Sequence, residues 1–116
     1  MTTTTHGISA VYLESHNWGK AARFFRALGY ELEFETDHNS GQLSNADTPP
    51  VFIAEVPANR PTSLALVLKA SSEKVVVESE DLELVTPFED THYGTREATV
   101  RDPDGRLWVL QAPAGR

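Results

Sequence analysis

The sequence contains no cysteine and far fewer basic than acidic residues. Without cysteine, disulfides, thiol nucleophiles and thiolate metal sites are excluded. Ten Lys and Arg against 17 Asp and Glu give a net charge of −7, which disfavours a phosphate-binding nucleic-acid surface. An acidic surface suits a cationic ligand, although it also serves solubility alone.

Long apolar runs are missing as well. No stretch approaches the roughly 18 apolar residues of a membrane-spanning helix, so no membrane contact is expected. Met1–His6 has neither a basic residue nor an apolar run, so no secretory signal is predicted and we expect a cytoplasmic protein. Residues 1–7 have the composition of a frayed tail. The 116 residues suffice for one domain, or for two small half-domains that share a core.

A hairpin near the end of the chain is the strongest local pattern. Arg96–Arg101 alternates apolar and polar residues, and Arg106–Gln111 is rich in residues that favour strands. Between them, Asp102-Pro103-Asp104-Gly105 has the residue types of a type I turn closed by a left-handed glycine. The pattern predicts two antiparallel strands joined by this turn.

The first half predicts one helix among several strands. Ile8–Glu14 is apolar at both parities, which predicts a buried strand. In the helix that follows, Asn17 or Ser15 fits the N-cap and Gly29 fits the C′ position. Tyr30–Glu35 alternates strictly, which predicts aromatic and aliphatic residues on one face and three glutamates on the other. The helix has an apolar stripe of Trp18, Ala21, Ala22, Phe25 and Leu28.

The remaining strands lie on either side of a proline-bounded linker, Pro57–Pro61. Only twelve residues, Ala70–Asp81, separate two of these strands, and Val75-Val76-Val77 disfavours a helix. We therefore expect a shortened or missing helix in this segment. The predicted strands are Gln42–Asn45, Val51–Val56, Ser63–Lys69 and Leu82–Pro87.

Two patterns at opposite ends of the chain point to the same family. The first is the strand Ile8–Glu14 followed by a helix with Phe24-Phe25 and then Leu28-Gly29-Tyr30. The second runs from Tyr93-Gly94 through Arg96 to the Asp102–Gly105 turn and Leu107-Trp108. Together they resemble the vicinal oxygen chelate superfamily, which contains glyoxalase I, bleomycin-resistance proteins and extradiol dioxygenases.

The resemblance implies an α+β fold in which paired βαβββ modules form a curled mixed sheet around a cleft. Residues 1–116 would form a single domain of this type. Its first module would span 8–56, its linker 57–61 and its second module 62–112, with the second-module helix shortened or absent. The bleomycin-resistance relatives imply a homodimer.

Enzymes of this family hold a divalent metal with His and Glu or Gln side chains. The resemblance places the first-strand ligand at Ala10 and the last-strand ligand at Val109, and neither side chain can bind a metal. Glu55 is the one weak candidate that is left on the strands. The histidines His6, His16, His38 and His92 lack a spacing that would pair two of them on one face. We therefore expect no metal ion and no other cofactor.

Without a metal site, the resemblance implies an apolar cleft that binds a ligand. With the family's parity, Gln111 also faces it, whereas Trp108 and Leu110 point the other way, into the layer under the helix. His92 borders the cleft and could bond a ligand or act as an acid or base. The expected ligand-binding residues are Ala10, Tyr12, Phe52, Ala54, His92, Tyr93, Arg96, Leu107 and Val109.

Three functions are consistent with these residues. The first is a metal-independent protein, similar to the bleomycin-resistance type, that binds an aromatic or cationic organic ligand in the cleft. The second is a glyoxalase-like lyase or dioxygenase whose metal is held by Glu55 and an unexpected histidine. The third is a dimeric interaction module whose own side chains fill the cleft. The residues assign no catalytic group.

Overall fold

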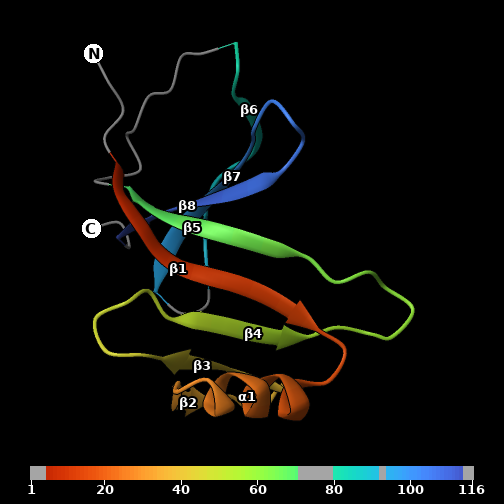
Figure 1. Ribbon diagram of the computed structural model, residues 1–116. Helices are drawn as coiled ribbons and strands as arrows, with labels where there is room; N and C mark the ends of the chain where they lie inside the picture. Colours follow the sequence, from red (N-terminus) through yellow and green to blue (C-terminus); the bar gives the residue numbers. More distant parts are fainter. Residues whose placement is uncertain (1–4, 71–79, 92–93, 114–116) are drawn as a thin grey trace. The chain divides into compact units, whose positions relative to one another are not determined.

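The computed structural model of the chain describes residues 5–70, 80–91 and 94–113 (Figure 1). The chain forms two compact units, Ala10–Leu64 and a second unit of Met1–Ser9 with Ala65–Arg116. Each unit contains its own apolar cluster. The elements are β1 (Thr5–Ser15), α1 (Trp18–Ala27), β2 (Glu31–Glu35), β3 (Ser40–Ser44), β4 (Val51–Glu55), β5 (Leu64–Ala70), β6 (Glu83–Asp90), β7 (Thr95–Arg101) and β8 (Leu107–Pro113).

The two units repeat one arrangement of strands. In the first unit the order is β2-β3-β4-β1, where β1 and β4 run parallel and the other neighbours run antiparallel. In the second unit the order is β6-β7-β8-β5, where β5 and β8 run parallel and the other neighbours run antiparallel. A parallel pair beside an antiparallel meander therefore occurs twice, which confirms the predicted α+β fold of paired modules. β2 and β6 are the outer strands.

The helix α1 begins and ends as predicted. Asn17 Oδ1 accepts a hydrogen bond from Lys20 N at 2.9 Å, so Asn17 rather than Ser15 is the N-cap. Gly29 follows the last turn with a φ of +99°, and its N–H donates to Arg26 O at 3.1 Å. Leu28 differs from the prediction, because the helix ends at Ala27 and the Leu28 side chain is 60% exposed. No helix in the described part of the chain is long and apolar enough to cross a membrane.

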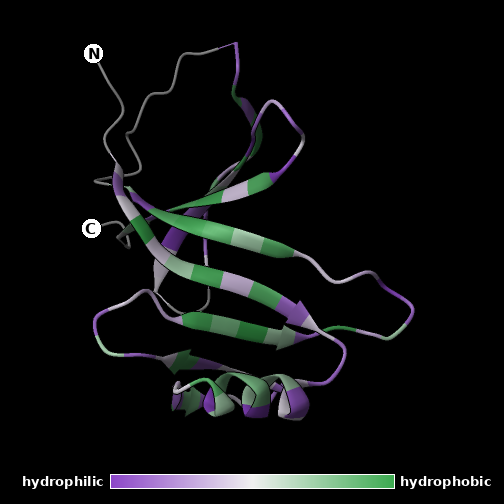
Figure 2. Ribbon diagram, viewed as in Figure 1, coloured by the Kyte–Doolittle hydropathy of each residue, from purple (hydrophilic) through white to green (hydrophobic). Residues whose placement is uncertain are grey.

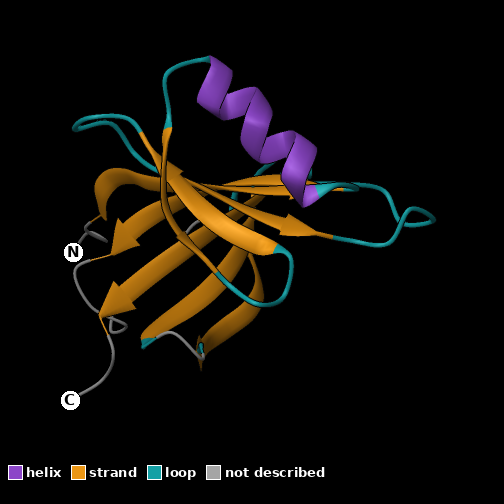
Figure 3. Ribbon diagram, turned by 90° about the horizontal axis from the view of Figure 1, so that it is seen from below, coloured by secondary structure: helices purple, strands orange, loops and turns teal. Residues whose placement is uncertain are grey.

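α1 covers one face of the first unit's sheet (Figure 3). Strand residues alternate between two faces, so the residues under the helix are every second one of β1 and β4. Figure 2 shows apolar residues along most of β4, since its other face is apolar as well. The cluster under the helix consists of buried Trp18, Leu43, Val51 and Ile53, with Val11, Leu13, Ala21, Ala22, Phe25 and Tyr30 packed against it.

The closing hairpin of the second unit has the predicted turn. Gly105 N donates to Asp102 O at 2.9 Å, Asp102 N donates to Arg106 O at 2.9 Å, and Gly105 has a φ of +87°. The carboxylate of Asp102 holds the turn from inside, because Oδ1 accepts from Asp104 N and Arg106 N. Its Oδ2 accepts from Trp108 Nε1 at 2.9 Å, which ties the turn to the first residues of β8.

Trp108 and Leu110 alternate with Val109, as predicted, but the residues that pack under α1 are those of the first unit's own cluster. Trp108 and Leu110 pack in the second unit's own cluster, where Leu110 pairs with Ala98 and Trp108 pairs with Val100. The physical reason is the repeat of the strand arrangement, which gives each module its own apolar sheet face to cover.

Two further predictions differ from the structure or fall outside it. β1 begins at Thr5, so His6 and Gly7 belong to a strand and not to a tail. The segment between β5 and β6, predicted to contain a shortened helix, is mostly residues 71–79, which lie outside the described residues.

Candidate functional site

The candidate site is the sheet face of the first unit that lies opposite α1. Register aligns one residue from each strand across this face: Phe34 opposite Gln42, Gln42 opposite Phe52, and Phe52 opposite Tyr12. Because their neighbours Val11, Leu43 and Val51 lie under the helix, these side chains emerge on the other side. We call the residues Tyr12, Phe34, Gln42 and Phe52 the aromatic face.

The rings of the aromatic face lie close enough to act as one surface. Tyr12 and Phe52 are stacked, with ring centroids 6.3 Å apart and planes 13° apart. Phe34 and Phe52 are 6.4 Å apart with a tilt of 44°. Phe34 is 48% exposed, and the other two rings are half-buried. Three partly open rings in one row provide a flat apolar surface of the kind that binds another ring by burial and stacking.

A buried carboxylate stands next to this row. Glu14 follows Tyr12 by two residues on β1 and is only 7% exposed. Its Oε2 accepts from the Tyr12 hydroxyl at 3.1 Å and from Arg60 Nη2 at 3.0 Å, and its Oε1 accepts from Ser63 N at 3.2 Å. Burial, and then the neighbouring charge of Glu14 and its hydrogen bond, raise the pKa of Tyr12, so the hydroxyl stays a donor at neutral pH.

A β-bulge in β2 places Phe34 on the aromatic face. Leu32 pairs with Leu43, which lies under the helix, whereas Phe34 pairs with Gln42 on the opposite face. The register shifts between Leu32 and Phe34, so strict alternation over Tyr30–Glu35 is wrong. Glu33 then lies by Gln42, whose Nε2 donates to Glu33 Oε1 at 2.6 Å.

The structure brings four of the predicted ligand-binding residues to one face. Tyr12 and Phe52 are direct partners, Ala54 pairs with Glu14, and Ala10 shares the parity of Tyr12 on β1. The sequence reasoning omitted Phe34, Gln42, Glu14 and Arg60. Glu14 had a usable signal, since Ala10, Tyr12 and Glu14 follow the two-residue period of a strand.

The other predicted residues belong to the second unit or lie outside the described residues. Val109 is half-buried and pairs with Val67 and Thr99, while Leu107 is 43% exposed. Arg96 pairs with Ala112 and thus lies on the opposite sheet face from Val109; its guanidinium donates to Asp90 Oδ1 at 3.1 Å. His92 and Tyr93 lie outside the described residues.

The side chains do not fit a divalent metal at the positions that the resemblance implies. Ala10 and Val109 carry no donor atom. Glu55 lies on the helix side of the sheet, where its Oε1 accepts from Trp18 N at 2.8 Å. His16 Nε2 lies 2.7 Å from Arg60 O, and His38 pairs with Asp37 at 3.2 Å. Within residues 5–70, 80–91 and 94–113, no three His, Asp or Glu side chains converge as a metal site would require.

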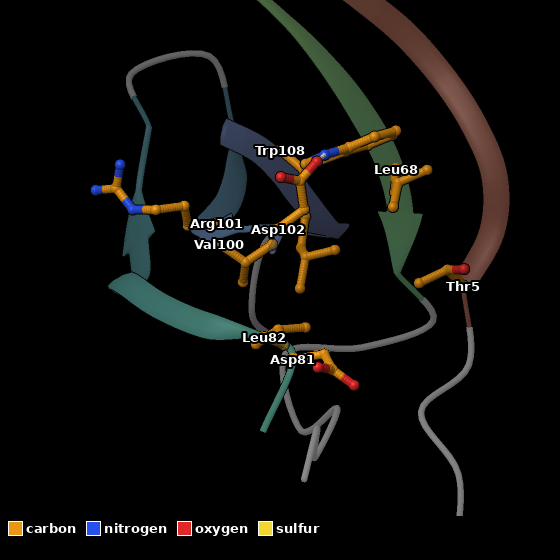
Figure 4. A pocket seen from close by; sticks show the side chains of 9 residues that line it. Thr5, Leu68, Asp81, Leu82, Val100, Arg101, Asp102 and Trp108 are labelled. Atoms are coloured by element: carbon orange, nitrogen blue, oxygen red, sulfur yellow. Dashed lines mark hydrogen bonds between the residues drawn. The ribbon is translucent and has the colours of Figure 1, made fainter. Parts of the chain in front are cut away.

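A separate hollow of about 440 Å³ lies within the second unit (Figure 4). It lies over the sheet face that corresponds to the helix-covered face of the first unit. In Figure 4 the Trp108 indole stands beside the Asp102 carboxylate, with which it forms the hydrogen bond of the turn. The Asp102 carboxylate is bonded within the hairpin, and Arg101 Nε lies 3.3 Å from Glu83 Oε1. Five of the nine lining residues are apolar, so the hollow offers mainly apolar surface. The lining residues are Thr5, Leu68, Asp81, Leu82, Val100, Arg101, Asp102, Trp108 and Leu110.

Comparison with solved structures identifies the fold. A glyoxalase/bleomycin resistance protein/dioxygenase superfamily member from Vibrio splendidus 12B01 is 17% identical, with a TM-score of 0.66 over 94% of this chain and 99% of that chain. The Mn(II)-bound glyoxalase from Novosphingobium aromaticivorans is 16% identical, with a TM-score of 0.65 over 98% of this chain and 42% of that chain. This chain thus spans about two-fifths of the second protein's length. No protein-family model matches the sequence, and no curated protein matches it.

The chain therefore has the fold of the glyoxalase/bleomycin resistance protein/dioxygenase superfamily. The resemblance to the vicinal oxygen chelate superfamily, predicted from the two ends of the sequence, is confirmed at the level of the fold.

Proposed function

We propose that this protein is a metal-independent binder of a small aromatic molecule, held on the aromatic face of the first unit. The observation that carries the proposal is the in-register row of Tyr12, Phe52 and Phe34 on the side of the sheet opposite α1. Burying about 200 Å² of apolar ligand surface against these rings would contribute on the order of 5 kcal/mol before the cost of association. The Tyr12 hydroxyl and the Gln42 amide supply the few polar groups that orient such a ligand.

Metal independence is supported by hydrocarbon side chains at Ala10 and Val109, where the resemblance implies ligands. We expect no change in the melting temperature of the protein on addition of Mn²⁺, Ni²⁺ or Zn²⁺. A ligand that binds only the folded state raises the melting temperature, so an upward shift would favour the glyoxalase-like enzyme instead. Such a result would also require a search for donors beyond Glu55.

Binding to the aromatic face is tested with two matched phenylalanine variants. Phe34 on the aromatic face and Phe24 on α1 are 48% and 60% exposed, so replacing either ring by Ala should leave the core intact. With acridine, a neutral aromatic probe at neutral pH, we expect Phe34→Ala to weaken binding about tenfold, or about 1.4 kcal/mol. Phe24→Ala should leave the dissociation constant unchanged in isothermal calorimetry.

Two outcomes contradict the proposal. Equal losses in Phe34→Ala and Phe24→Ala would show that acridine adheres to exposed rings in general. Absence of saturable binding to the wild-type protein, for acridine and for a panel of similar neutral ring systems, would favour a non-catalytic interaction module.

We also propose that the protein is cytoplasmic and acts as a homodimer. Large apolar side chains stay exposed in the second unit, among them Leu84 at 58% and Leu107 at 43%. Large exposed apolar side chains are typical of a surface that another chain covers. Light scattering at micromolar concentration should give twice the 12.8 kDa mass of one chain. A monomeric mass across the concentration range would contradict the dimer and leave the ligand proposal standing.

A further inference from the structure

The buried carboxylate of Glu14 lies beside the aromatic face and is joined to it through Tyr12. Ala10, Tyr12 and Glu14 alternate along β1 on the side of the aromatic face, so Glu14 stands at one end of the ring surface. Tyr12 joins the two, because its ring stacks on Phe52 and its hydroxyl donates to Glu14 at 3.1 Å. A ligand that lies along the rings is therefore next to the carboxylate, and it can contact the carboxylate once the Arg60 guanidinium has left.

The positive charge that balances Glu14 comes from a surface side chain. Arg60 Nη2 lies 3.0 Å from Glu14 Oε2; the Arg60 side chain is 57% exposed, whereas that of Glu14 is only 6% exposed. Arg60 belongs to the loop between β4 and β5, whose backbone is held by its own bonds, from Arg60 N to Pro57 O at 3.0 Å and between His16 Nε2 and Arg60 O at 2.7 Å. The guanidinium can thus leave the carboxylate by side-chain rotation while the loop keeps its place.

The buried Glu14 carboxylate needs a positively charged partner, but that partner does not have to be Arg60. Leaving Glu14 without a positive partner would be strongly unfavourable, because a buried charge loses its water. Exchanging the Arg60 guanidinium for another guanidinium or an ammonium keeps the carboxylate compensated, and the released Arg60 is solvated. The exchange itself is then nearly balanced, and the contact of the ligand's ring with Phe52 and Phe34 decides the affinity.

We propose that the aromatic face selects aromatic cations, whose positive group replaces Arg60 at the buried Glu14 carboxylate. The inference rests on the proposed binding function and names the ligand class. The net charge of −7 adds a long-range attraction for cationic ligands. Arg60 is in this view a competitor that is part of the chain, and neutral aromatic molecules bind without displacing it.

The test compares acridine, neutral at neutral pH, with 9-aminoacridine, which is cationic there and has the same ring system. Wild-type protein should bind the cation more tightly. Arg60→Ala should tighten 9-aminoacridine binding about tenfold and leave acridine unchanged, since a competitor for Glu14 has been removed. Glu14→Gln should abolish the preference for the cation. Arg23→Ala, which removes an exposed charge from α1, controls for the general field and should change both probes little.

A second readout needs no variant. In the wild-type protein the Arg60 Nε–H resonance should shift when 9-aminoacridine binds, because the guanidinium is released, and should stay in place with acridine. This measurement decides the matter if Glu14→Gln fails to fold.

The outcomes distinguish a failure of the cation exchange from a failure of the proposed binding function. Equal gains in Arg60→Ala and Arg23→Ala, or an unmoved Arg60 resonance, would overturn the cation exchange. If acridine then still binds in a Phe34-dependent manner, the proposed function stands and only the ligand class is wrong. If neither probe binds, both fall together.

Discussion

At the scale of single residues, Gly41 shows how a contact remote in sequence fixes a residue type. A Cβ atom at this position would lie 2.6 Å from Cη2 of the Trp18 ring and 2.7 Å from Phe34 O. Trp18 is 7% exposed because its ring lies directly on the Gly41 backbone. Nothing in the local sequence around Gly41 predicts this need, since Trp18 comes from the helix and the contact depends on strand register.

Gly41→Ala should therefore destabilise the protein. We expect the free energy of unfolding in urea to fall by about 1–3 kcal/mol, the usual cost of overpacking. Gly19→Ala in α1 is the matched control, because a Cβ there meets Arg23 Nη1 at 3.5 Å and Asn17 Oδ1 at 3.6 Å, which are ordinary contacts. That variant should gain about 0.4–1 kcal/mol through a less flexible unfolded chain. Similar effects of the two substitutions would refute the steric explanation.

Asp102 gives the hairpin a dependence on pH. The hydrogen bond from the Trp108 indole is the main cause that lowers the pKa of Asp102 from 3.8 to about 2, and the bonds from Arg106 and from Asp104 N act in the same direction. A carboxyl whose pKa is lower in the folded than in the unfolded chain stabilises the fold in its ionised form. That contribution is fully present above about pH 4 and is lost as pH falls through about 2.

Asp102→Asn should lower the free energy of unfolding at neutral pH, and the difference from wild type should shrink between about pH 4 and pH 2. Asp104→Asn is the control, because the Asp104 side chain is 74% exposed and its carboxylate pairs with the Arg106 guanidinium at the surface. Urea unfolding followed by far-UV circular dichroism across this pH range measures both. A difference for Asp102→Asn that does not change with pH would contradict the assignment.

At the scale of elements, local sequence signals were sufficient to predict caps and turns, but they could not predict strand register. The glycine after α1 and the Asp102–Gly105 turn depend on residues close in sequence and were predicted, and the N-cap was narrowed to Asn17 or Ser15, of which the structure shows Asn17. The bulge in β2 depends on how β2 pairs with β3, so alternation alone assigned Leu32 and Phe34 to one face. One extra residue in a strand reverses the face of every residue beyond it.

The N-cap can be tested at this scale. Asn17→Ala removes the side-chain oxygen that accepts from Lys20 N, and should lower the free energy of unfolding by about 1 kcal/mol. Asn59→Ala, in the exposed loop that follows β4, should stay within about 0.5 kcal/mol of wild type. Thermal and urea unfolding should agree on the order of the two variants, and a larger effect at Asn59 would contradict the capping role.

At the scale of the whole molecule, the resemblance to a known family implied the repeat of the strand arrangement, which the structure confirms, whereas part of the candidate site had no signal in the sequence. The resemblance implied that Tyr12 and Phe52 line one cleft. They are direct partners in the register of β1 and β4, and their role in binding a ligand stays a prediction. The Glu14–Arg60 pair joins residues 46 positions apart. No periodicity in the sequence relates them, because a loop conformation brings the guanidinium to the strand.

The two units should unfold together. Ala10–Leu64 is a unit of about 55 residues, and a chain of that size buries only about 60% of its extended surface and is marginally stable alone. Trp18 lies in the first unit and Trp108 in the second. We expect the two indole N–H signals in NMR spectra to lose their native shifts at the same urea concentration. Separate midpoints would show that each unit is stable independently.

The outer strand of each sheet has a consequence for the protein at high concentration. β2 carries Glu31, Glu33 and Glu35, and β6 carries Glu83, Glu89 and Asp90 together with Pro87, which has no N–H to donate. Two such edges repel each other while their carboxylates are ionised, so growth of one copy's sheet onto another is disfavoured. Acidification would remove that repulsion, and we expect fibril formation to begin only under acidic storage conditions.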